Sequence, residues 1–126
     1  MTDTDTKFQI LEMLEKDMIA FLKDKGFYDK PFTSLFKIRI KAEKQQEWLT
    51  NLQKTIPQTQ VEKGCICYEI SQDLEDSNLY AVYEKWANGE ALEYHFAQPY
   101  TKEFLGCFAD IVVDVKSHIL KPLSFS

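Results

Sequence analysis

The stretch from Gly64 to Phe96 contains His95, the side chain in this region best suited to acid–base chemistry near neutral pH. Ala91, Leu92, His95 and Phe96 recur at helical spacing, which predicts that His95 lies on the inward, apolar face of a short helix. A histidine in that position can accept a proton from a bound substrate. It can equally be a neutral core residue that hydrogen-bonds a backbone carbonyl, and the sequence leaves both interpretations open.

Two strands should precede this helix and fix its position. Residues 64–70 and 79–86 are rich in β-branched and aromatic side chains, and the polar, turn-forming residues 73–78 separate them. Adjacent strands with a short connection most simply form an antiparallel hairpin. Asn88 is then a typical N-cap, and Glu90 lies in the first helical turn, where the helix dipole favours a negative charge.

The rest of the chain supplies a third strand, further helices and a fourth strand. Residues 34–41 alternate apolar and basic side chains, which predicts a strand with one buried face. The other predicted elements are a helix over 6–25 ended by Gly26, a helix over 42–56 ended by Pro57, a short helix over 99–105, a strand over 108–115 and a tail over 117–126.

This order predicts the fold class. Without the first helix it is β-α-β-β-α-β, an α+β ferredoxin-like arrangement with a four-stranded antiparallel sheet and helices on one face. We divide the chain into an N-terminal helical extension and connector, residues 1–33, and a domain with a C-terminal tail, residues 34–126. The first helix must pack on this domain or on a partner subunit, and packing is a simpler role for it than that of a lid.

We expect a binding site in the cleft between the helices and the apolar sheet face, because ligand pockets are concave and mostly apolar with a few polar groups. Phe36, Trp86 and Phe96 are the candidate wall residues, although Trp86 can also serve only as core packing. Either Tyr68 or Tyr83 could add a hydroxyl to the cleft. The sequence does not decide which of these two tyrosines faces inward.

Composition and charge exclude several classes of protein. The 126 residues suffice for one domain, with 44% hydrophobic and 28% charged residues. A net charge of −5 argues against nucleic acid or an anionic membrane surface as a partner. The sequence contains no apolar run of membrane-spanning length and no signal-peptide pattern at its start. We therefore expect a cytoplasmic protein.

Metal and cofactor sites are not predicted. Cys65 and Cys67 are two residues apart on a strand and should share a face, but no His or further Cys follows at ligand spacing. The sequence has no glycine-rich phosphate loop, and we expect no cofactor. Arg39 is the only arginine. It could anchor an anionic substrate, but its place away from the apolar face favours an ion pair with a neighbour such as Glu69 or with a partner subunit.

Several short patterns occur together in a defined order. They are a Gly-Cys-x-x-Tyr strand, a Glu-x-Trp strand end, and a helix that ends in a His shortly before a Pro. Over residues 34–115 the chain resembles the antibiotic biosynthesis monooxygenase (ABM) domain family, which has a dimeric α+β barrel fold. The residues that carry the resemblance are Gly64, Cys65, Tyr68, Tyr83, Glu84, Lys85, Trp86, Asn88, Gly89, Glu90, Ala91, Leu92, His95, Pro99 and Tyr100.

The resemblance implies a homodimer, in which two sheets pack face to face across a two-fold axis. Members of the family include cofactor-free oxygenases, haem-degrading enzymes, isomerases of small signalling molecules, and proteins without demonstrated chemistry. The haem-degrading branch uses an Asn on the first strand and a later His. Phe36 stands where that Asn would be, and residues 100–104 contain no His. Haem binding is therefore not expected.

The resemblance favours a cofactor-independent monooxygenase that acts on a small quinol or phenol with molecular oxygen. In this interpretation His95 accepts the substrate proton and a tyrosine hydroxyl positions the substrate. Two alternatives stay open. One is an isomerase or detoxifying enzyme for a small reactive carbonyl metabolite, and the other is a non-catalytic dimeric ligand-binding protein.

Overall fold

The computed structural model describes residues 3–123 and, within that range, the side chains of residues 14–123. Residues 124–126 of the predicted tail lie outside the described residues. The elements are α1 (Asp3–Asp24), β1 (Phe32–Ile40), the 3-10 helix η1 (Ala42–Lys44), α2 (Gln45–Gln60), β2 (Cys65–Gln72), β3 (Leu79–Trp86), α3 (Gly89–Ala97), α4 (Pro99–Gly106), α5 (Phe108–Ile111) and β4 (Val112–Leu120).

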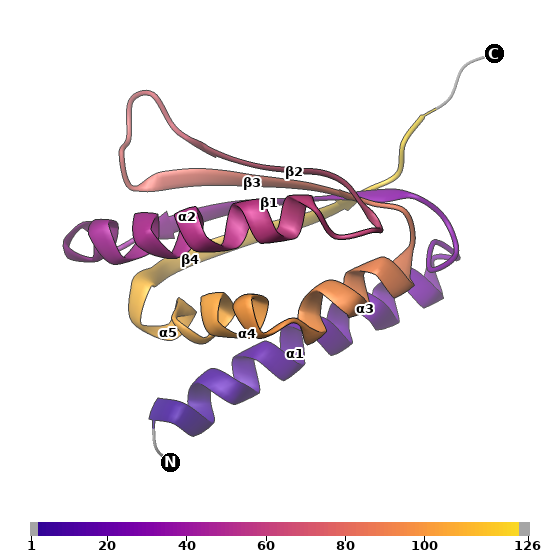
Figure 1. The fold of residues 1–126 in the computed structure, drawn as a ribbon, viewed down its shortest axis with the longest axis horizontal. Helices are drawn as coiled ribbons and strands as arrows, with labels where there is room; N and C mark the ends of the chain where they lie inside the picture. The colour runs from indigo at the N-terminus through magenta and orange to yellow at the C-terminus, as the bar shows by residue number, and fades with distance from the viewer. Residues whose placement is uncertain (1–2, 124–126) are drawn as a thin grey trace.

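The four strands form one antiparallel sheet in the order β2-β3-β1-β4. Figure 1 shows α2 to α5 on one side of this sheet, and α1 beyond the layer made by α3, α4 and α5. The α+β ferredoxin-like fold predicted from the element order is confirmed, with an N-terminal helix added to it. Of the helices that the structure describes, none has both the length and the apolar character needed to cross a bilayer.

Alternation along β1 separates the two faces of the sheet. Phe36, Ile38 and Ile40 are buried toward the helices, whereas Lys37 and Arg39 are exposed on the other face. The strand begins at Phe32 rather than at residue 34. The predicted alternation is therefore correct, because successive side chains of a strand point to opposite faces.

A β-bulge in β2 changes which side chains face inward. Cys65 pairs with Trp86, but Cys67 pairs with Lys85, so Ile66 is an extra residue with no partner of its own. Cys65 thus faces the core with Trp86, and Cys67 faces the opposite side. The prediction that the two cysteines share a face is wrong, because the bulge interrupts the period-two alternation on which it depended.

The second predicted helix extends further than its proline suggested. Pro57 lies inside α2, which ends at Gln60, so the prediction that Pro57 ends this helix is wrong. The last turn is held by packing: Thr55 and Thr59 are buried, and the Thr59 hydroxyl donates to the Thr55 carbonyl oxygen at 2.9 Å. This tertiary burial outweighs the hydrogen bond that a helical proline lacks.

The last strand starts later than its composition suggested. Residues 108–111 form α5, and β4 runs from Val112 to Leu120, through part of the predicted tail. The predicted strand over 108–115 is wrong in its first half because Phe108 packs against Trp48 and Phe104 in the helical layer. These aromatic contacts decide the local conformation, since β-propensity is weak compared with tertiary packing.

Candidate functional site

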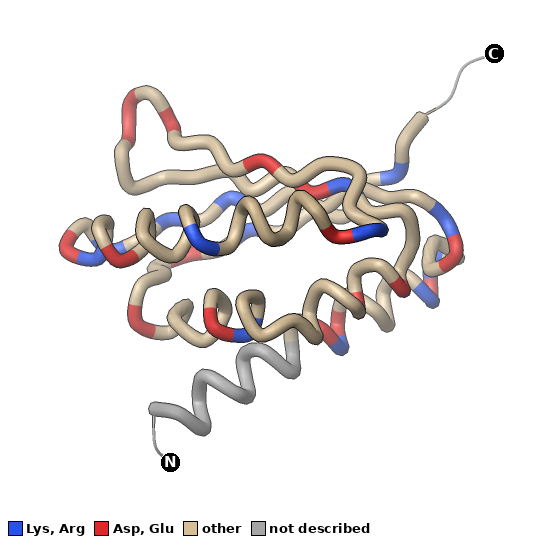
Figure 2. Tube along the Cα trace, in the orientation of Figure 1, with Lys and Arg blue, Asp and Glu red and all other residues tan. Residues whose placement is uncertain are grey.

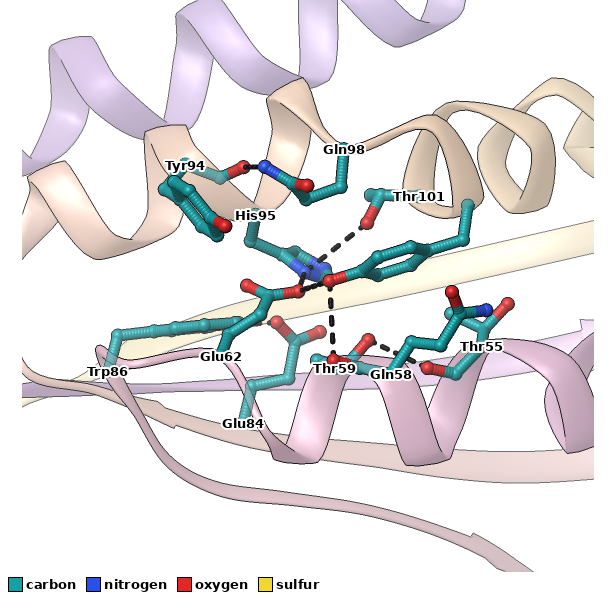
Figure 3. Close-up of polar contacts among 11 residues, drawn as sticks. Thr55, Gln58, Thr59, Glu62, Glu84, Trp86, Tyr94, His95, Gln98 and Thr101 are labelled. Atoms are coloured by element: carbon teal, nitrogen blue, oxygen red, sulfur yellow. Dashed lines mark hydrogen bonds and ion pairs between the residues drawn. The ribbon is translucent and has the colours of Figure 1, made fainter.

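His95 lies on the inner side of α3, as its helical spacing predicted, and is 6% exposed. The helix begins at the predicted cap, where the Asn88 side-chain oxygen accepts a hydrogen bond from the Ala91 amide at 2.8 Å. Leu92 and Phe96 are buried on the same face, while Tyr94 is exposed. In Figure 3, His95 points from its helix toward the sheet, where Glu84 and Trp86 lie.

The partner of His95 is a carboxylate rather than a backbone carbonyl. Glu62 Oε2 lies 2.9 Å from His95 Nδ1, and both side chains are buried. The Tyr100 hydroxyl donates to the same Glu62 oxygen, and the Thr101 hydroxyl lies 3.3 Å from His95 Nδ1. Figure 3 shows this cluster between the end of α2 and the start of α4.

This arrangement determines which nitrogen of His95 can act as a base. A carboxylate at Nδ1 favours the tautomer that carries its proton there, which leaves the lone pair of a neutral ring on Nε2. Within residues 14–123, His95 Nε2 makes no hydrogen bond. Glu62 also stabilises the protonated ring, so His95 can accept a proton at Nε2 and keep the charge paired.

A second carboxyl group approaches His95 from the sheet. Glu84 lies on the inner face of β3, is 7% exposed, and accepts a hydrogen bond from Trp86 Nε1 at 3.0 Å. Burial raises the pKa of Glu84 to about 7, and the neighbouring His95 and the Trp86 hydrogen bond oppose that rise only in part. Glu84 therefore changes its protonation state near neutral pH and can donate or accept a proton.

Glu84 and His95 border an apolar cavity of about 270 Å³ between the sheet and the helices. Three polar residues, Glu84, His95 and Thr101, belong to its wall together with Tyr68. The other wall residues are hydrophobic and come from the helices and the inner sheet face: Leu14, Met18, Phe36, Ile38, Val82, Phe96, Phe104, Leu105, Phe108, Ala109, Val112 and Val115. A mostly apolar wall with a few polar groups is typical of small-molecule sites.

Tyr68 is the tyrosine that the structure turns toward the cavity. It pairs with Glu84 across the hairpin, is 3% exposed, and has its ring centre 5.9 Å from that of His95. Its hydroxyl makes no hydrogen bond within residues 14–123, and burial raises the pKa of Tyr68 well above its usual value. The hydroxyl thus stays protonated and can donate to a ligand in the cavity.

The structure brings together most of the predicted site residues. Phe36 and Phe96 line the cavity with His95 and Tyr68. Trp86 is fully buried outside the cavity wall, with its ring centre 4.8 Å from that of His95. Tyr83 does not join this set: it lies on the open face of the sheet and is 39% exposed.

Arg39 also lies on the open face. Its guanidinium forms an ion pair with Asp76 at 2.5 Å, in the turn between β2 and β3 where Figure 2 shows a group of acidic residues. Arg39 is therefore paired as the sequence favoured, although the partner is not Glu69. It is not among the residues that line the cavity.

The sequence did not predict four polar residues of the site, which are Glu62, Glu84, Tyr100 and Thr101. Glu62 follows α2 in a short polar segment that reads as an exposed turn, and Tyr100 begins a separate helix. Glu84 alternates with apolar residues on β3, which was a usable signal for an inward carboxyl. Nothing in the sequence pairs Glu62 with His95, because 33 positions separate them and only the fold closes that distance.

Comparison with known proteins gives the family. The family model for antibiotic biosynthesis monooxygenase matches residues 31–106. The uncharacterized protein sll1783 of Synechocystis sp. is 33% identical over 84 residues, which cover 67% of this chain and 57% of that protein. The "Putative monooxygenase YcnE" of Bacillus subtilis is 28% identical over 58 residues, which cover 46% of this chain and 61% of that protein. The matched segments thus span only about three-fifths of each of these relatives.

Solved structures agree on the fold. The crystal structure of PA3566 from Pseudomonas aeruginosa has a TM-score of 0.71 and 25% identity, and the match covers 77% of this chain and 98% of that chain. Rv0793 from Mycobacterium tuberculosis has a TM-score of 0.69 at 17% identity, with 77% and 99% covered. The family match covers more than half of the sequence, and the chain belongs to the antibiotic biosynthesis monooxygenase family.

Proposed function

We propose that this protein is a cofactor-independent monooxygenase that oxidises a small phenol or quinol with molecular oxygen. One observation carries the proposal: His95 Nε2 and the Tyr68 hydroxyl both lack a hydrogen-bond partner within residues 14–123, and both residues border the same apolar cavity. A phenolic hydroxyl between them would donate to the base and accept from the tyrosine. The apolar wall would hold the ring and exclude water.

The substrate supplies the electrons in this reaction. His95 takes the hydroxyl proton, and the electron-rich phenolate ring forms a bond from a ring carbon to one oxygen atom of O₂. The peroxide takes a proton and its O–O bond then breaks, as the hydrogen on that ring carbon leaves with the outer oxygen as water. The ring carbon becomes a carbonyl. One oxygen atom thus enters the quinone product and the other enters water.

The two buried carboxyl groups have different roles in this proposal. Glu62 holds His95 in the required tautomer and pairs with the protonated ring that forms during the reaction. Glu84, which borders the cavity and has a pKa of about 7, supplies a proton near the developing peroxide. Tyr100 keeps Glu62 in place through its hydroxyl and does not belong to the cavity wall.

Oxygen labelling tests the proposal. With 1-naphthol under ¹⁸O₂, the wild type should produce 1,4-naphthoquinone that carries one ¹⁸O atom, at a rate above autoxidation. His95→Ala should lower this rate by about 100- to 10,000-fold, the usual contribution of a general base. His118→Ala is the matched control, because His118 is exposed on β4. An undiminished rate in His95→Ala would remove His95 from the mechanism.

A second enzymatic function is favoured by the Glu84–His95 pair. A base next to a carboxyl group with a pKa of about 7 can move a proton between adjacent carbons of a small reactive carbonyl compound. This isomerase or detoxifying reaction consumes no oxygen. The test is an incubation of dihydroxyacetone with the protein in D₂O in the absence of oxygen, followed by NMR. Enzyme-dependent exchange of carbon-bound hydrogen for deuterium would distinguish this reaction from that of the oxygenase. Binding of 1-naphthol without turnover in either assay would point to a ligand-binding protein.

We also propose that two copies of the chain form a homodimer through the open sheet face. That face presents apolar side chains to solvent, among them Tyr83 at 39% and Leu120 at 43% exposure, and no helix within residues 3–123 covers it. Light scattering after size exclusion should give twice the chain mass of 14.8 kDa. Tyr83→Lys should shift the protein toward monomer, and a monomeric wild type would contradict the proposal.

A further inference from the structure

Helix α1 lies outside the family match but contributes to the cavity. The family model begins at residue 31, whereas Leu14 and Met18 of α1 line the cavity that His95 borders. These two residues are one helical turn apart, so they present a continuous apolar surface to it. Figure 1 shows α1 running along α3, α4 and α5, on the side of these helices that faces away from the sheet.

The C-terminal end of α1 is anchored to the helix that carries His95. Leu22 is 1% exposed in the core, and the chain then turns at Gly26, whose φ of +76° is accessible to glycine without strain. The Tyr28 carbonyl accepts a hydrogen bond from the Gly89 amide at 2.6 Å. The Tyr28 hydroxyl donates to Glu93 at 2.6 Å. The connector therefore fixes α1 against α3 at a defined position.

Contact with Tyr28 also requires a glycine at the start of α3. A Cβ atom on Gly89 would come within 2.2 Å of the Tyr28 ring, which is closer than atoms can approach. The tyrosine ring thus packs directly on the backbone of α3. This fit means that the anchor is part of the folded domain, and α1 is held beside the cavity rather than tethered loosely to it.

The side chains of α1 differ in kind from the polar part of the site. Met18 is 7% exposed and lines the cavity, while Phe21, three positions later, is 44% exposed on another side of the helix. Methionine has a flexible, unbranched side chain that adapts to the shape of its neighbours. A wall made of Met18 and Leu14 can therefore limit how much apolar bulk the cavity admits without taking part in proton transfer.

We propose that α1 is the size-selecting wall of the site and that Met18 is its specificity-determining residue. The polar groups of α3, β2 and β3 hold the hydroxyl end of a phenol, and α1 sets the length of the alkyl or aryl substituent that the ring can carry. This inference rests on the proposed function for the phenolic class of its ligand, but it concerns binding and not oxygen chemistry.

The proposal predicts opposite effects for two substitutions at one position. Affinities of 4-methylphenol and 4-butylphenol are measured by isothermal titration calorimetry, and their ratio is compared between variants. Met18→Ala should improve the relative affinity for 4-butylphenol about tenfold. The shorter side chain makes room for about two more buried CH₂ groups of the ligand, and each adds about 0.8 kcal/mol. Met18→Phe should change the ratio in the other direction. Since both phenols are measured on each variant, a general loss of folded protein affects the two equally.

Phe21→Ala is the matched control on α1, and it should leave the ratio as it is in the wild type because this side chain is exposed. The proposal is overturned if Met18→Ala changes both affinities by the same factor, or if Phe21→Ala has the same effect as Met18→Ala. Failure of the proposed function looks different: the ratio then responds to Met18 while 1-naphthol yields no labelled quinone. If the wild type binds neither phenol, both ideas are wrong.

Discussion

The two faces of the sheet carry the same kinds of residue in different surroundings. Tyr68 and Glu84 pair across the hairpin on the inner face and are 3% and 7% exposed. Tyr83 and Glu69 form a neighbouring pair on the outer face, where Tyr83 is 39% exposed and Glu69 is also exposed. Burial raises the pKa of Glu84 to about 7 and that of Tyr68 well above its usual value. The different acid–base properties of the inner side chains thus come from their burial and not from their residue type.

A single extra residue sets part of this difference. With strict alternation, Cys65 and Cys67 would share a face and Tyr68 would lie on the other one. The bulge at Ile66 turns Cys67 outward while Tyr68 faces Glu84 on the inside. The inner face therefore has a tyrosine at the position where its hydroxyl can reach the cavity, and the following predictions test this contrast between the faces.

The largest effect is expected from an inner aromatic residue. Trp86→Ala should destabilise the protein by about 3–5 kcal/mol, because Trp86 is fully buried and packs on His95. Tyr83→Ala on the outer face should cost about 1 kcal/mol or less. Urea unfolding measures both, at a protein concentration low enough to keep the two variants monomeric, because the proposed dimer would bury Tyr83. Equal losses would mean that the outer face is buried as well.

The next effect is the dependence of stability on pH. Because burial raises the folded-state pKa of Glu84 from 4.5 to about 7, the folded state binds more protons than the unfolded state between these values. Stability should therefore fall as pH rises from 4.5 to 7, by roughly 3 kcal/mol for this group, and change no further above that range. Glu84→Gln should remove this component of the slope in urea unfolding curves measured at several pH values.

Glu69→Gln is the matched control for this pH experiment, since Glu69 is an exposed glutamate on the outer face. It should leave the slope between pH 4.5 and 7 in place. The interpretation of Glu84 as a buried, easily protonated group fails if Glu84→Gln keeps the wild-type slope. It also fails if the difference in stability between the wild type and Glu84→Gln changes with pH in the opposite direction.

A smaller effect should follow from adding a methyl group at the contact between Gly64 and α3. Gly64 precedes β2, and a Cβ atom there would lie 2.2 Å from the Ala91 Cβ and 3.2 Å from its Cα on α3. Gly64→Ala should lower the free energy of unfolding by about 1–3 kcal/mol, because α3 must move away from the strand. Gly106→Ala, with no atom near its Cβ, should be neutral or slightly stabilising. Thermal unfolding of both variants gives the comparison.

The smallest expected effect concerns one hydrogen bond to a ligand. Tyr68→Phe should weaken 1-naphthol binding by about 2- to 10-fold, the usual value of one neutral hydrogen bond. Tyr83→Phe removes the same hydroxyl from the outer face and should leave the dissociation constant unaltered. Titration calorimetry of the two variants against the wild type decides the matter, and equal affinities in all three proteins would exclude Tyr68 as a donor.

Local patterns in the sequence predicted those parts of the molecule that depend on near neighbours. The cap at Asn88, the inward side of α3 with His95, and the alternation of β1 all follow from the spacing of residues within one element, and the structure has each of them. The family pattern belongs to the same level, because the residues that carry it lie close together in the sequence, between Gly64 and Tyr100. Element order then restricts the fold to one arrangement.

The predictions that failed each depended on contacts between distant parts of the chain. Pro57 stays inside α2 because Thr55 and Thr59 are buried, and residues 108–111 are helical because Phe108 packs on aromatic neighbours. Local propensity is worth up to about 0.7 kcal/mol for an ordinary residue and about 3 kcal/mol for a helical proline, whereas burying one large side chain is worth about 1.5–3 kcal/mol, and α2 buries both Trp48 and Leu52. Where local propensity and side-chain packing favour different conformations, packing therefore determines the structure.

The sequence by itself determined the fold class, the family and the helical face that carries His95. Only the tertiary structure decided that Glu62 is the partner of His95, that Tyr68 and not Tyr83 faces the cavity, and that α1 closes part of its wall. The physical reason is the range of the interactions. Periodicity within an element is written in adjacent residues, but a hydrogen bond across 33 positions, a one-residue bulge and a helix docked from outside the family domain exist only after the chain has packed.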